Sequence, residues 1–157
     1  MPQAAQRERA RRHAIWLIVL LALFVFRVSA QLLQWFFPTS WLPPFAAWHS
    51  ATLSYPVLVE TQVAIIMVAV WLIRGLLRDT IIPNAALGRV LTWVGAVYFT
   101  GSVLRLMAGL TFGRDHAFLG AYLPGIFHVV LAIMVLTAGN YYRNDASLIP
   151  KSLRPGS

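Results

Sequence analysis

The stretch AIWLIVLLALFVFRVSAQLLQWFF, residues 14–37, decides the fold of this chain. It is apolar along its whole length except for Arg27, Ser29 and a pair of glutamines. As a helix it is long enough to cross the roughly 30 Å hydrocarbon core of a bilayer. It lacks the polar–apolar alternation of an outer-membrane strand. Backbone groups in lipid must be hydrogen-bonded within their own segment, so the stretch predicts a transmembrane helix.

Three further apolar runs, at residues 57–77, 89–112 and 118–142, have similar length and character. The connections between the runs are short, which favours antiparallel packing of consecutive helices. Together the runs predict an all-α fold, an integral membrane four-helix antiparallel bundle. We expect residues 1–142 to form this single transmembrane domain and the polar residues 143–157 to form a disordered cytoplasmic tail.

The composition excludes several other classes of protein. Apolar residues make up 59% of the 157 residues and charged residues 11%, whereas a soluble domain carries about 25% charged residues. The net charge is +8, but the basic residues lie between the apolar runs and not in a patch on a soluble fold. We therefore expect no nucleic acid partner. The chain has no cysteine, which excludes disulfides and thiolate-bound metals.

The basic residues also set the orientation in the membrane. The first connection has none and the third has only Arg114. The two tails and the second connection hold Arg7, Arg9, Arg11, Arg12, Arg74, Arg78, Arg89, Arg143, Lys151 and Arg154. Because basic residues are enriched in cytoplasmic segments, this asymmetry predicts that both termini are cytoplasmic. We expect a multi-pass protein of the cell membrane, and specifically of a bacterial inner membrane.

The first apolar run also allows a second interpretation. The arginine pair at 11–12, the apolar stretch after it and the small residues 28–30 resemble a secretory signal with a cleavage site. However, the apolar run resumes at Leu32 and reaches Phe37, so it is long enough to span the membrane. We therefore expect the first helix to be retained.

Two segments have features beyond their hydropathy. The first connection, residues 38–56, contains Trp41, Phe45 and Trp48 at near-helical spacing. This is typical of either a short interfacial helix or a lid over a cavity at the outer face.

The third run is rich in small residues, which let helices approach closely in lipid, so we expect this helix to be central in the bundle. Its small residues are Gly95, Gly101, Ser102, Ala108 and Gly109.

Ionisable side chains inside the apolar runs are the main candidates for a site. A charge at the bilayer centre costs roughly 2.5–3.5 kcal/mol on insertion scales and normally faces protein or water. Arg27, Gln31 and Gln34 recur at i, i+4 and i+7 and form one stripe on the first helix. A similar stripe on the third includes Tyr98 and Arg105. The pattern predicts a polar pocket open to the non-cytoplasmic face. Its candidate ligand-binding residues are Arg27, Gln31, Glu60, Arg105 and His128.

A purely structural interpretation of these residues stays open. In it, Glu60 pairs with Arg105 or Arg27 as a buried ion bridge, which by itself says little about function. Two arginines against one glutamate leave an excess of positive charge, however. That excess favours either water or an anionic ligand.

We expect no metal site, and the sequence predicts no particular cofactor. A bis-histidine haem needs two facing histidines, and only His128 lies well inside an apolar run. His49, Asp115 and His116, near the outer surface, offer at most a loose metal site. The sequence also lacks a glycine-rich phosphate loop, an H-E-x-x-H motif and a Ser-His-Asp arrangement.

Several short motifs resemble those of the DoxX-type small four-helix membrane proteins. They are Arg27 in the first run, YFTG at 98–101 before Arg105 in the third, and LPGIFH at 123–128 in the fourth. The resemblance covers nearly the whole chain in architecture. It implies a four-helix bundle that works beside a respiratory or lipid-soluble redox partner, and it supplies no catalytic residues. The glutamines of the first run and the tryptophan-rich connection have no counterpart in it.

Three functions fit these residues. The favoured one is an accessory or binding subunit whose pocket holds a lipid or quinone-like anion, with Arg27 and Arg105 as donors and Glu60 holding them in place. An alternative is a membrane enzyme acting on a lipophilic substrate, with His128 or Glu60 as general acid or base. Another alternative is a small proton-coupled transporter that uses Glu60. The expected partners are membrane lipids, together with a membrane protein or a second copy of the chain.

Overall fold

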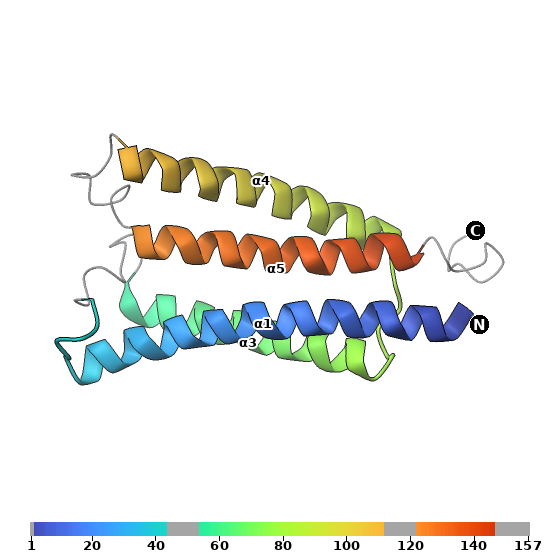
Figure 1. Ribbon diagram of the computed structural model, residues 1–157, viewed down its shortest axis with the longest axis horizontal. Coiled ribbons are helices and arrows are strands. Elements are labelled where there is room, and N and C mark those ends of the chain that lie inside the picture. Colours follow the sequence, from blue (N-terminus) through green and yellow to red (C-terminus); the bar gives the residue numbers. More distant parts are fainter. Residues whose placement is uncertain (1, 44–53, 112–121, 147–157) are drawn as a thin grey trace.

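The computed structural model describes residues 2–43, 54–111 and 122–146 (Figure 1). This part of the chain is helical and contains no strand. Its helices are α1 (Pro2–Phe36), α3 (Tyr55–Leu77), α4 (Ala85–Thr111) and α5 (Tyr122–Ala146). Each of the four is long and apolar enough to cross a membrane. The prediction of an all-α membrane protein with four apolar helices is therefore confirmed.

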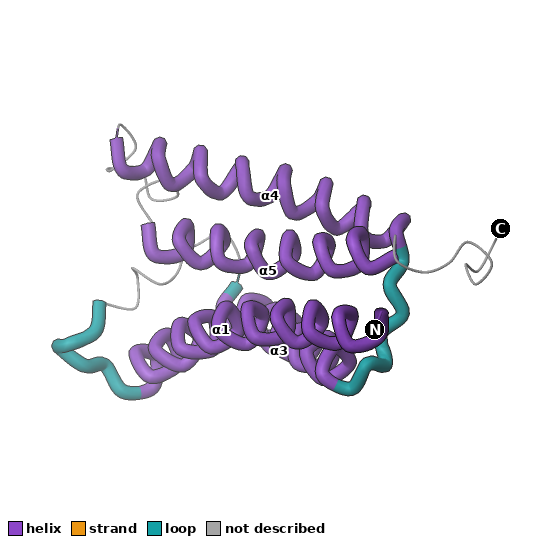
Figure 2. The backbone as a smooth tube through the Cα atoms, turned by 45° about the vertical axis from the view of Figure 1, so that its right-hand side comes forward, coloured by secondary structure: helices purple, strands orange, loops and turns teal. Residues whose placement is uncertain are grey.

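The helices run side by side with alternating direction (Figures 1 and 2). We call the end where α1 begins and α5 ends the terminal end, and the other the distal end. Three helices extend beyond the apolar runs at the terminal end, and α4 does so by beginning at Ala85. The helix α1 extends through the basic segment before Ala14, and α5 continues to Ala146. The alanines, arginines, glutamines and glutamate before Ala14 are strong helix formers, which accounts for the extension of α1.

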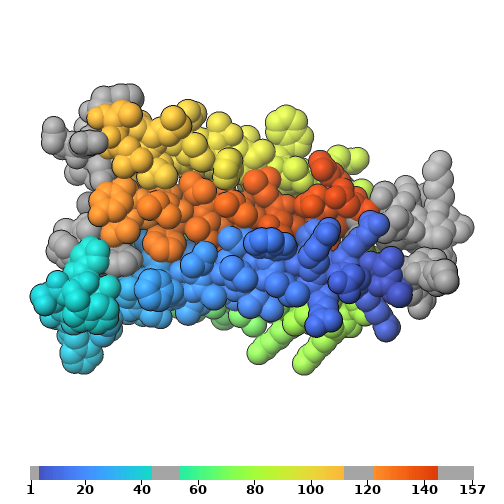
Figure 3. Space-filling view, viewed as in Figure 1, coloured from blue at the N-terminus to red at the C-terminus, as the bar shows by residue number. Residues whose placement is uncertain are grey.

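Close packing joins α4 to α5, α5 to α1 and α1 to α3. Among the described helices, no other pair of backbones approaches closely. The four helices therefore form an open series in the order α4–α5–α1–α3, and not a closed ring. In the space-filling view, α5 is visible between α1 and α4 (Figure 3). Grooves are left on both sides of α5, and they position the sites described below.

The expectation that the third apolar run is central is wrong. This run is α4, and it lies at the edge of the series, packed against α5 alone. Its buried small residues recur every seven positions and form a seam with α5. They are Gly88, Gly95, Ser102 and Gly109. A Cβ atom added at Gly95 would lie 2.9 Å from Leu136, so the small residues serve one tight helix pair.

The apolar core fills the terminal half of the molecule. Leu17 on α1, Leu76 on α3 and Tyr141 on α5 are among its most buried members, each 3% exposed or less. The α3–α4 turn is held against this end, because Arg7 Nε pairs with Asp79 Oδ2 at 2.9 Å. The turn also ends in a helix cap, since Asn84 Oδ1 accepts hydrogen bonds from the backbone N–H groups of residues 86 and 87.

The outward surfaces of the helices are apolar. Phe26, Met67 and Val97 are each more than 60% exposed. Exposed apolar side chains on every helix are what a lipid solvent requires, since they gain nothing by facing water. Tryptophans are exposed towards both ends, with Trp16 and Trp93 in the terminal half and Trp41 beyond the distal end of α1. This distribution resembles the aromatic belts at the two interfaces of a membrane.

Candidate functional site

Arg27 lies inside the molecule, in the distal half of α1. Its side chain is only 6% exposed. The guanidinium carbon lies 5.4 Å from the centre of the Phe127 ring on α5. A cation over an aromatic face is attracted by the ring quadrupole, and the attraction is larger where water is excluded. The contact orients Arg27 towards α5.

Arg105 on α4 and His128 on α5 are joined by a hydrogen bond. The distance from Arg105 Nη1 to His128 Nδ1 is 3.1 Å. A guanidinium can only donate, so Nδ1 must accept. His128 is then a neutral imidazole that carries its proton on Nε2. The Tyr98 ring on α4 lies 6.0 Å from the His128 ring, centre to centre.

The two arginines belong to one group of polar residues. Arg27 lies over the ring of Phe127, the residue before His128 on α5, and Arg105 is hydrogen-bonded to His128 itself. Three helices, α1, α4 and α5, therefore supply one cluster in the distal half of the molecule. We call Arg27, Tyr98, Arg105 and His128 the polar cluster.

Next to the Arg27 turn of α1, Gln31 is paired with a second buried glutamine, Gln62 of α3. Gln62 Nε2 on α3 donates to Gln31 Oε1 at 3.3 Å, and the two side chains are 4% and 1% exposed. The Gln31 Nε2 group is buried and has no hydrogen-bond partner among the described residues. Gln62 was not among the residues predicted from the sequence, where the charged groups stood out, although a glutamine inside an apolar run is itself a signal.

Gln34 has a local role and does not join the polar cluster. Its Oε1 atom accepts hydrogen bonds from the backbone N–H of Thr39 at 3.0 Å and from the Thr39 hydroxyl at 3.1 Å. The side chain thus fixes the chain where α1 ends. Gln34 follows the periodicity of the Arg27 stripe, but its side-chain amide is engaged by Thr39.

Glu60 does not pair with either arginine. It is exposed, and no ion pair of Glu60 occurs within the described part of the chain. Glu60 lies two positions before Gln62 on α3, so the two side chains point about 200° apart around the helix axis. Because Gln62 faces α1, Glu60 must point outward. The structure therefore brings together Arg27, Arg105 and His128, places Gln31 beside them, and leaves Glu60 out.

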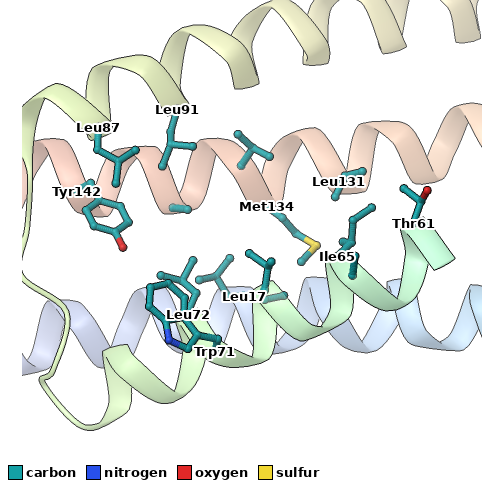
Figure 4. Close-up of a pocket in the computed structure, with 15 residues that line it drawn as sticks. Leu17, Thr61, Ile65, Trp71, Leu72, Leu87, Leu91, Leu131, Met134 and Tyr142 are labelled. Atoms are coloured by element: carbon teal, nitrogen blue, oxygen red, sulfur yellow. The ribbon is translucent and has the colours of Figure 1, made fainter.

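An apolar groove lies between α3 and α4, with α5 and α1 beneath it (Figure 4). Its volume is about 490 Å³. Leu72 from α3, Leu91 from α4 and Leu131 and Met134 from α5 line it. The groove exists because α3 and α4 do not pack against each other. It opens sideways, in the direction that lipid would occupy.

The polar cluster lies beyond the distal end of this groove, and its residues do not line the groove. On α4, Leu87 and Leu91 line the groove, and Tyr98 and Arg105 follow Leu91 at seven-residue steps on the same face. On α5, Leu131 lines the groove, and His128 lies one turn before it. Helix periodicity thus aligns the polar cluster with the apolar groove along α4 and α5.

No metal site accompanies the cluster in the part of the chain that the structure describes. No group of three metal-ligating side chains occurs there. The loose alternative formed by His49, Asp115 and His116 lies outside the described residues. Most of the tryptophan-rich connection, residues 44–53, lies outside them as well, so neither the interfacial helix nor the lid is tested.

No protein-family model, curated protein or solved structure matches this chain. The resemblance to DoxX-type proteins therefore stays a prediction from the sequence.

Proposed function

We propose that this chain is a membrane-embedded binding protein for a lipophilic anion. The ligand class is an amphiphile with one anionic or strongly polar head and an apolar tail, such as an acidic lipid or a quinone-like molecule. The head binds at the polar cluster and the tail lies in the apolar groove. One observation carries this proposal, namely that Arg105 and His128 lie on the same helix faces as the residues that line the groove.

The chemistry of the cluster suits such a head group. A guanidinium has five N–H donors in a planar fork, so Arg105 can hold His128 and a ligand oxygen at once. His128 receives the Arg105 hydrogen bond at Nδ1, which leaves its Nε2–H as a donor for the ligand. Hydrogen bonds from charged donors are stronger where water is excluded. The groove volume of about 490 Å³ is within the usual range of about 300–1,000 Å³ for small-molecule sites.

The exposed position of Glu60 weighs against the two alternative functions, a proton-coupled transporter and a membrane enzyme. A transporter that exchanges protons through Glu60 needs this carboxylate inside the bundle, and it lies on the outside. An enzyme would have to rely on His128, since Glu60 is not beside it. A protein that only binds its ligand needs no acid or base, and the hydrogen-bond donors of the polar cluster are sufficient for it. The membrane-protein partner, or a second copy, and the cytoplasmic orientation of the termini are further parts of this proposal.

Native mass spectrometry of the gently extracted protein tests the proposal. We expect the wild-type chain to retain an amphiphilic ligand through extraction in a mild detergent. Arg105→Gln should lose that ligand, because it removes the main donor to the head group. Arg89→Gln is the matched control, since it makes the same change on an exposed residue of the same helix. A wild-type chain without a bound amphiphile, or an unchanged ligand in Arg105→Gln, would contradict the proposal.

A further inference from the structure

A second groove runs along the opposite side of α5, between α1 and α4 in the terminal half. Its volume is about 930 Å³. The α5 residues that line it, among them Ile133 and Leu136, face away from those that line the apolar groove. The helices α1 and α4 do not pack against each other, so this groove also opens sideways to the lipid. We call it the terminal groove.

The polarity of the terminal groove changes along its length. Arg12, His13 and Asn140 line the part nearest the terminal end. Leu20, Ile133 and Leu136 line the part about two turns deeper. Trp16 lies between these two parts and is 59% exposed. Tryptophan prefers the level where head groups meet acyl chains, so the groove has the same polar and apolar division as one bilayer leaflet.

The basic residues of this groove are suitably arranged for a phosphate. Within the described residues, Arg12 forms no ion pair with a carboxylate, although Glu8 lies one turn earlier on α1. His13 is held in place, because its Nδ1–H donates to the Arg9 carbonyl at 2.8 Å and its ring packs edge-on against Tyr141 at 5.7 Å. In this tautomer Nε2 carries no proton, so His13 donates to a phosphate from Nε2 only when its ring is doubly protonated.

The threonines of the groove are already occupied. The Thr92 hydroxyl donates to the Gly88 carbonyl and the Thr137 hydroxyl to the Ile133 carbonyl, both at 2.7 Å. A ligand therefore meets hydrogen-bonding groups mainly at the end that holds Arg12.

We propose that the terminal groove binds an anionic phospholipid of the cytoplasmic leaflet. The phosphate lies against Arg12 and His13, and an acyl chain lies along Leu20, Ile133 and Leu136. The cytoplasmic leaflet carries a negative surface potential that attracts basic residues at this level. The assignment uses the orientation predicted from the basic residues, and it is independent of the polar cluster, which lies in the other half of the molecule.

The test is a native mass spectrometry titration of the full chain in detergent with phosphatidylglycerol, and with phosphatidylcholine as the neutral comparison. We expect the wild type to prefer phosphatidylglycerol, and Arg12→Gln to bind it about fivefold more weakly, the size expected for one basic residue at an anionic surface. Arg11→Gln is the matched control. It removes the same charge from the adjacent residue, which does not line the groove, and should change the affinity less than twofold.

Equal losses in Arg11→Gln and Arg12→Gln would show that only overall charge matters, and would overturn the proposal. So would equal affinity of the wild type for both lipids. If Arg105→Gln abolished phosphatidylglycerol binding while Arg12→Gln did not, the lipid would bind at the polar cluster, which also overturns it.

A second measurement uses the wild-type chain and does not depend on how a charge variant folds. Brominated phosphatidylglycerol should quench Trp16 fluorescence, obtained as the difference from Trp16→Phe, more strongly than brominated phosphatidylcholine. Equal quenching by the two lipids would contradict the site.

Discussion

At the scale of single residues, the structure explains how a chain in lipid holds Arg27. The guanidinium is buried against the Phe127 ring of another helix. An aromatic face stabilises the cation while keeping the surroundings apolar. Phe127 therefore positions the arginine, and the ligand-binding proposal depends on this contact.

A double-mutant cycle measures the Arg27–Phe127 contact. Phe127→Leu should lower the free energy of unfolding by about 1–2 kcal/mol beyond its packing cost, since the pair is desolvated. In an Arg27→Leu background the same substitution should cost less, because no cation remains. Thermal unfolding in detergent of the four proteins gives the coupling energy. Simple additivity of the two substitutions would show that the ring does not stabilise the arginine.

At the scale of the elements, the apolar runs could be predicted from sequence but the neighbours of each helix could not. Length and hydropathy are properties of one segment, so four spans followed directly from them. The edge position of α4 depends on which helix faces its glycine seam, and small residues fit a central helix and a tight pair equally well. The prediction that Glu60 lies in the pocket is wrong because hydropathy does not show which side of α3 faces α1. The contact of Gln62 with Gln31 shows it.

The same reasoning separates the part of the site that could be predicted from the part that could not. Arg27, Arg105 and His128 stand out as costly groups in apolar runs, so the sequence singled them out and the structure brings them together. Their partners Phe127 and Gln62 are ordinary residues in such runs. The apolar groove arises from a missing helix contact, which no single segment encodes.

The glycine seam gives a test with an internal control. A Cβ atom at Gly139 would lie 2.8 Å from the backbone nitrogen of Thr92, which cannot move aside, whereas one at Gly101 would have nothing within 4 Å. Gly139→Ala should therefore destabilise the protein by about 1–3 kcal/mol. Gly101→Ala should be neutral or stabilising, because alanine favours a helix. Thermal unfolding in detergent checks both, and similar melting temperatures for the two variants would argue against a tight α4–α5 seam.

At the scale of the whole molecule, the open series α4–α5–α1–α3 leaves a groove on each side of α5. The polar cluster lies beyond the distal end of the apolar groove, and the terminal groove ends among basic residues. A closed ring of helices would have filled both with side chains. The architecture therefore suits a protein that holds amphiphiles better than one that only anchors itself.

Filling the apolar groove should displace a bound amphiphile without touching the polar cluster. Leu91→Trp places an indole in the groove, whereas Val90→Trp places the same ring on a surface that is 58% exposed. We expect native mass spectrometry to show loss of the ligand in Leu91→Trp and its retention in Val90→Trp. Retention in both variants would mean that the tail lies elsewhere.

The orientation of the molecule can be tested directly, because the chain contains no cysteine. Single cysteines introduced as Ala5→Cys and Ser40→Cys mark the two ends at exposed positions. With both termini cytoplasmic, a membrane-impermeant thiol reagent added to intact cells should label Ser40→Cys but not Ala5→Cys. After permeabilisation both should react. Labelling of Ala5→Cys in intact cells would show that the topology is the reverse of the predicted one. The terminal groove would then not face the cytoplasmic leaflet.

The central claim is that one amphiphile occupies both the polar cluster and the apolar groove. An experimental structure of the chain crystallised from a lipidic mesophase, with its co-purified ligand, tests this claim most directly. We expect head-group density within hydrogen-bond distance of Arg105 and of His128 Nε2, and tail density running past Leu131. Arg27 and Arg105 side chains directed into surrounding lipid, with no ligand density between them, would contradict it.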